Sequence, residues 1–413
     1  MADFHQSNTI ATLHRLRPGR LPAMEAELEK YARNTGIGLI LPALISEFER
    51  PAMRRIVDQL RDARYFSNIV VAVGRATRKQ VADVAHWFRG FRSPVTLLWV
   101  EDPRVQELLG QLDKAGLPAR IDGKGRTCWL SMGYLLAEGQ SDVIALHDCD
   151  IVNYTRDIPA ALCYPLAHPR LNFDFCKGYY ARISEKLHGR VTRLFLAPLL
   201  ESLKEHTAES PFLNFLREFR YPLAGEFALT SSLANKVRLP ADWGLEVGVL
   251  SEVFHHAGPT RACQADIADN YEHKHQDLSP TDPSRGLRRM TYDIAGAMFR
   301  CFPLESEQLR RVASAYADHA TNKVRQYEAD ALMNGLHYDR AEELNAITSF
   351  GDSLHEAIAT AGAVAPVLPA WSAVRSAVPG LFNSLRDCAF ATPSPARIAV
   401  PHWWQQVPKP ALS

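Results

Sequence analysis

Between residues 36 and 150, short apolar runs alternate with stretches whose apolar residues recur at helical spacing, and this pattern limits the possible folds. The apolar runs, each predicting a buried strand, are 36–44, 69–73, 95–100 and 143–147. The intervening stretches place apolar residues on one helix face, as with Ile56, Val57 and Leu60. Strands that alternate with helices of this length imply a mostly parallel sheet covered on both faces. We therefore predict an α/β fold with a Rossmann-like sheet flanked by helices.

The pattern changes after residue 150 and again after residue 300. We divide the chain into an N-terminal helical segment (1–35), a sheet domain (36–300, with halves 36–150 and 151–300) and a C-terminal extension (301–413). In the extension, 304–345 predicts one or two amphipathic helices and 352–361 another. A helix is also predicted over 191–205, with a kink at Pro198. The last fifty residues are rich in Pro and Ala and predict an irregular tail.

Composition excludes several classes of protein. The formal net charge is +1, so we expect neither nucleic acid nor an acidic membrane surface as a partner. The most apolar run, 36–45, has about half the length of a membrane-spanning helix. Seven cysteines are scattered without a CxxC pair, which argues against a zinc site or a disulfide framework. We expect a globular protein of the cytoplasm.

Two aspartates, Asp148 and Asp150, flank Cys149 directly after the strand at 143–147. Ligands of such sheets bind beyond the carboxyl ends of the strands, which is where this motif lies. Carboxylates are the hard ligands that a divalent cation bridging a diphosphate requires. Two aspartates at this spacing also cap helices and turns in many proteins, so the motif alone leaves both interpretations open.

Two glycine-containing segments precede predicted helices and could each bind an anion. Lys124 lies between Gly123 and Gly125, where the backbone can approach a phosphate closely. The turn at 189–192, read as Gly-Arg-Val-Thr, could bind a phosphorylated or carboxylated acceptor through backbone N–H groups and its side chains. Each segment, taken alone, is equally explained as a solvated turn before a helix.

Two further residues have both a functional and an ordinary interpretation. Glu246 lies in an apolar stretch and belongs either to an exposed helix face or to a cleft where it holds a hydroxyl group. His273 could complete a metal site begun by the aspartates, because imidazole is a common ligand, although most isolated histidines are not ligands.

The order of these segments is more specific than any one of them. In sequence they are PAL (42–44), GKG (123–125), DCD (148–150), FCKGYYARI (175–183), GRVTRL (189–194), LAGEFALT (223–230), WGLEVGVLSE (243–252) and His273. Together, over about residues 36–300, they resemble glucosyl-3-phosphoglycerate synthases and the related mannosyl-3-phosphoglycerate synthases.

This resemblance implies a retaining GT-A glycosyltransferase, typically homodimeric, that transfers a hexose from a nucleotide diphosphate sugar to 3-phosphoglycerate. Glucose is favoured over mannose, the metal would be Mg²⁺ or Mn²⁺, and 36–150 and 151–300 become the nucleotide-sugar and acceptor halves. The implied donor residues are Pro42, Ala43, Leu44, Glu47, Lys124, Asp148 and Cys149. The implied metal ligands are Asp150 and His273. The implied acceptor residues are Gly189, Arg190, Val191, Thr192, Leu223, Gly225 and Glu246, and those implied in catalysis are Glu246, Asp148 and Lys124.

The chain departs from the family pattern in two segments and leaves two alternatives open. The family's PALNEE is PALISE here (42–47), and the loop around His273 is less basic, so donor and acceptor preference could differ. One alternative is a glycosyltransferase acting on another small acceptor, such as glycerate or a glycerol derivative. The other is a non-catalytic protein that binds sugar nucleotides on a GT-A scaffold. A nucleotidyltransferase is less well supported, because a Gly-rich signature near the first strand is missing.

Overall fold

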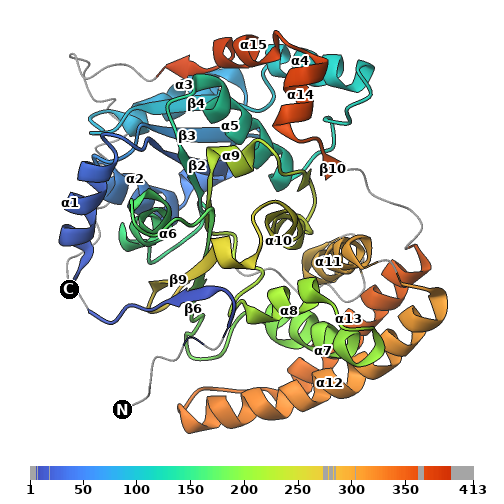
Figure 1. Ribbon diagram of the computed structural model, residues 1–413. Helices are drawn as coiled ribbons and strands as arrows, with labels where there is room; N and C mark the ends of the chain where they lie inside the picture. Colours follow the sequence, from blue (N-terminus) through green and yellow to red (C-terminus); the bar gives the residue numbers. More distant parts are fainter. Residues whose placement is uncertain are drawn as a thin grey trace.

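The centre of the protein is a mixed sheet that runs through most of its length (Figure 1). A computed structural model describes residues 6, 8–17, 19–272, 278, 282, 285–302, 304–360 and 367–391. The nine strands of the sheet, in spatial order, are β1 (Ala11–Leu13), β9 (Ala262–Ala268), β6 (Phe175–Tyr180), β7 (Phe227–Thr230), β5 (Val143–Leu146), β2 (Ile37–Leu44), β3 (Asn68–Gly74), β4 (Val95–Trp99) and β11 (Phe390–Ala391).

The predicted parallel sheet is confirmed between β5 and β4. Strands β5, β2, β3 and β4 are mutually parallel, with Ile40 opposite Leu146 and Val70 opposite Thr96. Every residue of β3 is buried, which explains why such strands read as continuous apolar runs. Strand β7 lies antiparallel between β5 and β6, and strands β6, β9 and β1 run parallel to one another. The sheet is therefore mostly parallel, with β7 reversed near its centre and β11 reversed at the edge beside β4.

Helices cover both faces of the sheet, as predicted. Leu39 and Leu41 of β2 pack in one core with α1 (Leu21–Tyr31), α2 (Pro51–Leu60) and α6 (Asp157–Ala167). Ile40, which points to the opposite face, packs in a second core with α4 (Pro103–Lys114), α5 (Lys124–Glu138) and α10 (Leu245–His256). Figure 1 shows α1, α2 and α6 on one side of the sheet and α5 and α10 on the other.

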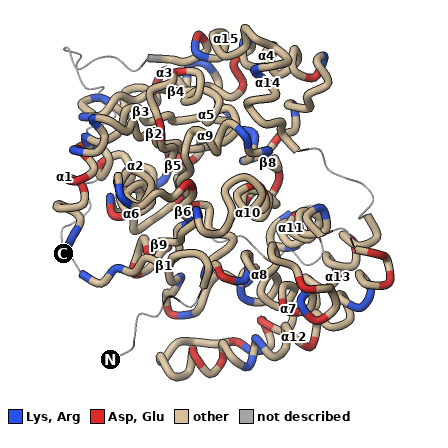
Figure 2. Tube along the Cα trace, viewed as in Figure 1, with Lys and Arg blue, Asp and Glu red and all other residues tan. Residues whose placement is uncertain are grey.

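A group of helices packs beside this sheet and extends the second core. Its members are α7 (Ala197–His206), α8 (Pro211–Glu218), α11 (Gly286–Cys301), α12 (Ser306–Met333) and α13 (Arg340–Ala359). One or two helices were predicted over 304–345, and the structure has two there, α12 and the start of α13. The separate helix predicted over 352–361 is wrong, because α13 continues without a break to Ala359. Figure 2 shows charges of both signs interspersed along α12, where Glu307 pairs with Arg310 and Arg311.

The helix predicted over 191–205 has an irregular first part. Residues Val191–Leu196 form π-helical turns that lead directly into α7. Pro198 lies in the first turn of α7, where its missing N–H is tolerated. None of the helices in the described part of the chain combines the length and hydrophobicity needed to cross a bilayer.

The irregular tail predicted for the last fifty residues is wrong for residues 367–391. These form β10 (Val367–Leu368), α14 (Trp371–Ala377), α15 (Leu381–Asp387) and β11, while Trp403 and Trp404 lie outside the described residues. The Trp371 ring stacks on that of Trp129 in α5, with centroids 4.2 Å apart and planes at 18°. β10 pairs with β8 (Leu239–Pro240), and β11 pairs with β4.

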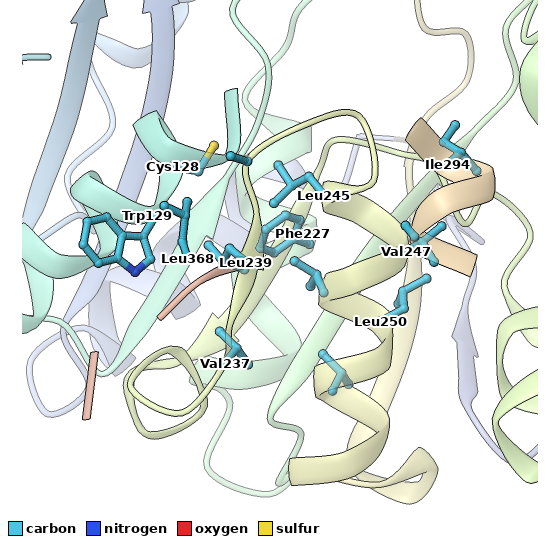
Figure 3. Close-up of a cluster of buried hydrophobic side chains, with 14 of the residues drawn as sticks. Cys128, Trp129, Phe227, Val237, Leu239, Leu245, Val247, Leu250, Ile294 and Leu368 are labelled. Atoms are coloured by element: carbon cyan, nitrogen blue, oxygen red, sulfur yellow. The ribbon is translucent and has the colours of Figure 1, made fainter. Parts of the chain in front are cut away.

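The Pro- and Ala-rich composition led to a wrong prediction here, because residues 367–391 are held in regular structure by residues far away in the sequence. Figure 3 shows Leu368 and Trp129 in one apolar cluster with Leu239, Phe227 and residues of α10. Strands from each of the three predicted segments share the main sheet, and the division at residues 35 and 300 stays a prediction.

Candidate active site

Lys124, Asp148 and Glu246 meet at one end of a cavity, although they come from three different elements. Lys124 begins α5, Asp148 follows β5, and Glu246 lies in the first turn of α10. The Lys124 Nζ lies 2.6 Å from Asp148 Oδ1 and 3.6 Å from Glu246 Oε1. Burial alone would lower the pKa of the Lys124 ammonium, but the two carboxylates raise it well above its usual value. Lys124 is therefore held as a fixed positive charge.

Glycines allow this cluster to form. Gly123 has a φ of +150° and lies so close to Ala241 that a Cβ would be 2.0 Å from its carbonyl oxygen. A Cβ on Gly225 would lie 2.7 Å from Asp148 Oδ2 and 3.0 Å from Lys124 Nζ. Any side chain at residue 225 would therefore displace the charged groups, which gives this predicted residue a steric reason to be glycine.

The cavity has a volume of about 380 Å³ and brings all of the predicted acceptor and catalytic residues together. Those that line it are Lys124, Asp148, Gly189, Arg190, Val191, Thr192, Leu223, Gly225 and Glu246. Trp243, Tyr180, Tyr221 and Arg182 also line it and were not singled out from the sequence. Glu246 is 8% exposed and lines the cavity, so it does not belong to an exposed helix face, and its role toward a hydroxyl group stays a prediction.

The predicted nucleoside residues do not line this cavity. Pro42, Ala43 and Leu44 end β2, the strand beside β5, and Glu47 lies in the 3₁₀ turn Ile45–Glu49 that follows. The Glu47 carboxylate is near enough to raise the pKa of Cys149, whose burial is the larger cause. These residues therefore lie around the Asp148–Asp150 motif on the side of β2.

The burial of Asp150 and the negative charges around it suit a ligand of a divalent cation. Burial raises its pKa to about 7, and the negative charges of Asp148 and Glu47 add to the effect. Crowded carboxylate oxygens are hard donors whose mutual repulsion a divalent cation would relieve, so these residues fit Mg²⁺ or Mn²⁺. Within the described residues no group of three or more potential ligands is assembled, and His273, the predicted partner of Asp150, lies outside them.

A buried carboxylate that sequence reasoning missed lies directly behind Asp148. Glu226, the residue before β7, is fully buried and accepts hydrogen bonds from the hydroxyls of Tyr180, at 2.8 Å, and Tyr271. The two tyrosine rings stack at 3.8 Å. The Asp148 backbone N–H also donates to Glu226, at 3.4 Å. Glu226 therefore fixes the backbone of the aspartate motif; its place inside LAGEFALT was the available signal.

The acceptor turn is also more constrained than its sequence indicated. Arg190 donates through Nε to Glu343, at 2.7 Å, and its Nη2 lies 2.7 Å from Glu342. Arg193 bonds the second oxygen of Glu343, at 2.9 Å. The charge of Arg190 is therefore compensated by two carboxylates of α13.

Comparison with known proteins assigns the chain to a family. No family model matches it. It is 42% identical over 393 residues to the glucosyl-3-phosphoglycerate synthase of Persephonella marina, covering 93% of this chain and 97% of that one. The chain belongs to the glucosyl-3-phosphoglycerate synthase family. A second glucosyl-3-phosphoglycerate synthase, from Methanococcoides burtonii, is 38% identical over 370 residues, covering 86% and 89% of the two chains.

The match to the glucosyl-3-phosphoglycerate synthase family covers more of the chain than the sequence motifs covered. A coverage of 93% reaches into the residues beyond 300, which the sequence resemblance had left out. Among solved structures, the glucosyl-3-phosphoglycerate synthase of Mycobacterium tuberculosis with Mn²⁺, UDP-glucose and phosphoglyceric acid superposes with a TM-score of 0.52 at 22% identity. That superposition covers 72% of this chain and 88% of the other, and it confirms the predicted GT-A fold. The same protein was also solved with Mg²⁺ and UDP.

Proposed function

We propose that this protein transfers glucose from UDP-glucose to 3-phosphoglycerate, with retention at the anomeric carbon and with a divalent cation. The observation that carries the proposal is the cavity in which Lys124, Asp148 and Glu246 face the turn at 189–192. One end of this cavity holds charged groups suited to a sugar diphosphate, and the other holds a turn suited to an anionic acceptor. The relatives at 42% and 38% identity carry the name of this activity.

Each part of the site has a role in this reaction. Pro42, Ala43, Leu44, Glu47 and Cys149 would surround the nucleoside, and Asp148 would bind on the ribose or sugar side. Asp150 and His273 would hold the cation, which, when bound, supplies positive charge against the diphosphate. Lys124 would add a fixed charge to the departing phosphate, and Glu246 would orient hydroxyl groups of the hexose or acceptor.

No side chain is assigned as the general base. Every carboxylate at the reaction end of the cavity already has a structural or charge partner: Asp148 pairs with Lys124, and Lys124 also faces Glu246. Attack on the same face as the leaving group, with the departing phosphate oxygen accepting the acceptor's proton, needs no further base. The bond from the anomeric carbon to the diphosphate oxygen breaks as the bond from the anomeric carbon to the acceptor oxygen forms.

The test is a matrix of donors and acceptors read by nucleotide release. UDP-, GDP- and ADP-glucose are each offered with 3-phosphoglycerate, glycerate and glycerol 3-phosphate, with Mg²⁺ and with a chelator. We expect the highest kcat/KM for UDP-glucose with 3-phosphoglycerate and loss of turnover in chelator. Preference for glycerate would indicate the alternative acceptor, and UDP binding without turnover of any donor would indicate the non-catalytic alternative.

Three further properties belong to the same proposal. We expect a homodimer, which sedimentation or light scattering would detect, and a cytoplasmic location. We expect residues 36–150 to bind the donor and 151–300 the acceptor, with 301–413 supporting the acceptor side. Binding of UDP should therefore be insensitive to substitutions in the turn at 189–192.

A further inference from the structure

Arg182 occupies a fixed position in the cavity, between β6 and the turn at 189–192. Its backbone carbonyl accepts from His188 N–H at 2.9 Å, and residues 183 and 187 form an antiparallel bridge. The next residue, Ile183, is bonded in both directions to the side chain of Asn270, at 2.9 and 2.7 Å. The loop that carries Arg182 is therefore pinned at both ends, and its guanidinium lines the cavity.

Within the part of the chain that the structure describes, the guanidinium of Arg182 has no carboxylate partner, unlike Lys124 and Arg190, the other two half-buried cations of the cavity. Its Nη1 donates to the Tyr221 hydroxyl at 3.1 Å, while its Nε is buried and has no hydrogen-bond partner. Among the ion pairs of the described residues, none includes Arg182, whereas Lys124 and Arg190 each face two carboxylates. A cationic side chain that lines a cavity and has no carboxylate partner is available to a bound anion.

The surroundings of Arg182 place this donor next to the acceptor turn. The Tyr221 hydroxyl that Arg182 contacts lies 3.5 Å from where a Cβ on Gly189 would be. Arg182, Tyr221 and Gly189 all line the same cavity. A guanidinium without a carboxylate partner, beside a tyrosine hydroxyl, suits a tetrahedral oxyanion that can accept from several directions.

We propose that Arg182 binds the phosphate of the acceptor and so determines the preference for a phosphorylated acceptor. This inference rests on the proposed function, in that it names the residue that selects the substrate class of the same site. Arg190 contributes less net charge, because Glu342 and Glu343 already compensate it. Lys186 also lines the cavity and has no ion pair among the described residues, but it is exposed. The half-buried positive charge left uncompensated for a phosphate dianion is therefore that of Arg182.

The test compares the Arg182→Gln and Arg182→Lys variants with a matched control. The control is Arg20→Gln, which removes another arginine that bonds a tyrosine hydroxyl, Tyr164, at 3.3 Å outside the cavity. In Arg182→Gln we expect the KM for 3-phosphoglycerate to rise roughly tenfold to a hundredfold. The KM for UDP-glucose should stay within about twofold, and the preference for 3-phosphoglycerate over glycerate should fall by the same factor as acceptor affinity. The KM of Arg182→Lys for 3-phosphoglycerate should lie between those of the wild type and Arg182→Gln. Arg20→Gln should have the same KM values as the wild type.

Direct binding separates this inference from the proposed function. Calorimetry with 3-phosphoglycerate measures affinity in the absence of turnover, so it reports on Arg182 even if the transferred sugar or donor differs. Equal affinities of wild type and Arg182→Gln, or no binding by the wild type, would overturn the inference. If Arg182→Gln does not fold, Arg182→Lys and Tyr221→Phe decide instead: unchanged affinity in both would overturn it. A wild type that binds 3-phosphoglycerate through Arg182 but transfers no glucose would overturn only the proposed function.

Discussion

Arg190, in the predicted acceptor turn, donates to Glu343 on α13 at 2.7 Å, although 153 residues separate the two in sequence. The second oxygen of Glu343 bonds Arg193 at 2.9 Å, and Glu343 is 4% exposed. A helix of the C-terminal extension therefore holds the turn that opens the acceptor side of the cavity. The extension is a structural part of the site and not only a neighbour of it.

We predict that Glu343→Ala destabilises the protein by about 3–5 kcal/mol, because it leaves the buried guanidinium of Arg193 without its carboxylate and removes one of the two carboxylates of the half-buried Arg190. The KM for the acceptor should rise while UDP affinity stays unchanged. Urea unfolding and steady-state kinetics measure the two effects. The control is Glu342→Ala on the same helix, whose side chain is 45% exposed and whose loss should cost less than about 1 kcal/mol. Equal losses of stability in both variants would contradict the prediction.

Asp148→Ala should abolish turnover and preserve the fold. The substitution removes the carboxylate that lies 2.6 Å from the Lys124 Nζ. The same carboxylate is the group proposed to bind the ribose or sugar of the nucleotide sugar. We expect kcat/KM to fall by at least roughly a hundredfold, with an unchanged circular dichroism spectrum. Asp142→Ala, at the other end of β5, is the matched control and should keep its activity. His273→Ala should lose turnover as well; full activity in either the Asp148 or the His273 variant would remove this site from consideration.

Trp371→Ala should weaken the fold without altering the chemistry. Trp371 is 1% exposed, stacks on Trp129 and donates through Nε1 to the Trp129 carbonyl at 3.0 Å. Truncating a buried tryptophan costs about 3–5 kcal/mol, and the cavity is lined by other residues. Thermal unfolding should therefore shift downward while kcat at low temperature stays the same. Ser376→Ala, an exposed substitution in the same helix, should leave the melting temperature unchanged; a large shift there would mean that α14 itself, not the tryptophan, is responsible.

Acid should destabilise the protein through His147, which directly precedes Asp148. The ring donates through Nδ1 to the Asp148 carbonyl at 2.9 Å, and its Nε2 lies 3.0 Å from the Tyr154 hydroxyl. Burial lowers its pKa from 6.5 to about 4. Between these values the unfolded chain binds a proton that the folded chain does not, so stability falls as pH falls from 6.5 to 4.

The loss through His147 amounts to about 3 kcal/mol over that interval. Urea unfolding at a series of pH values would measure it. A His147→Gln variant should lose stability less steeply over the same interval, because glutamine does not titrate. An identical slope in the variant would assign the acid sensitivity to other groups.

Local patterns were sufficient to predict the parallel part of the sheet, because each buried strand there is a continuous apolar run. They could not predict that β7 runs antiparallel between β5 and β6, since Phe227–Thr230 is short and its direction depends on both neighbours. For the same reason β10 and β11 were missed: their partners, β8 and β4, lie far away in sequence.

The candidate site was predictable where family motifs marked it. Lys124, Asp148, Glu246 and the turn at 189–192 were named from the sequence, and the fold brings them to one cavity. Glu226 and Arg182 were not named, although both lie inside quoted segments. Their importance depends on burial and on which partners they have or lack, and neither property is visible in a sequence.

The short strand β11 has a consequence for the behaviour of the whole chain in solution. It covers the outer edge of β4, placing Phe390 opposite Leu97 and Ala391 opposite Thr96. Without it, unpaired N–H and C=O groups along an apolar strand would be open to strands of other molecules. We therefore expect a chain shortened to residue 389, which keeps α14 and α15 and lacks β11, to aggregate on concentration, so that these few residues protect the protein against intermolecular β-sheet growth.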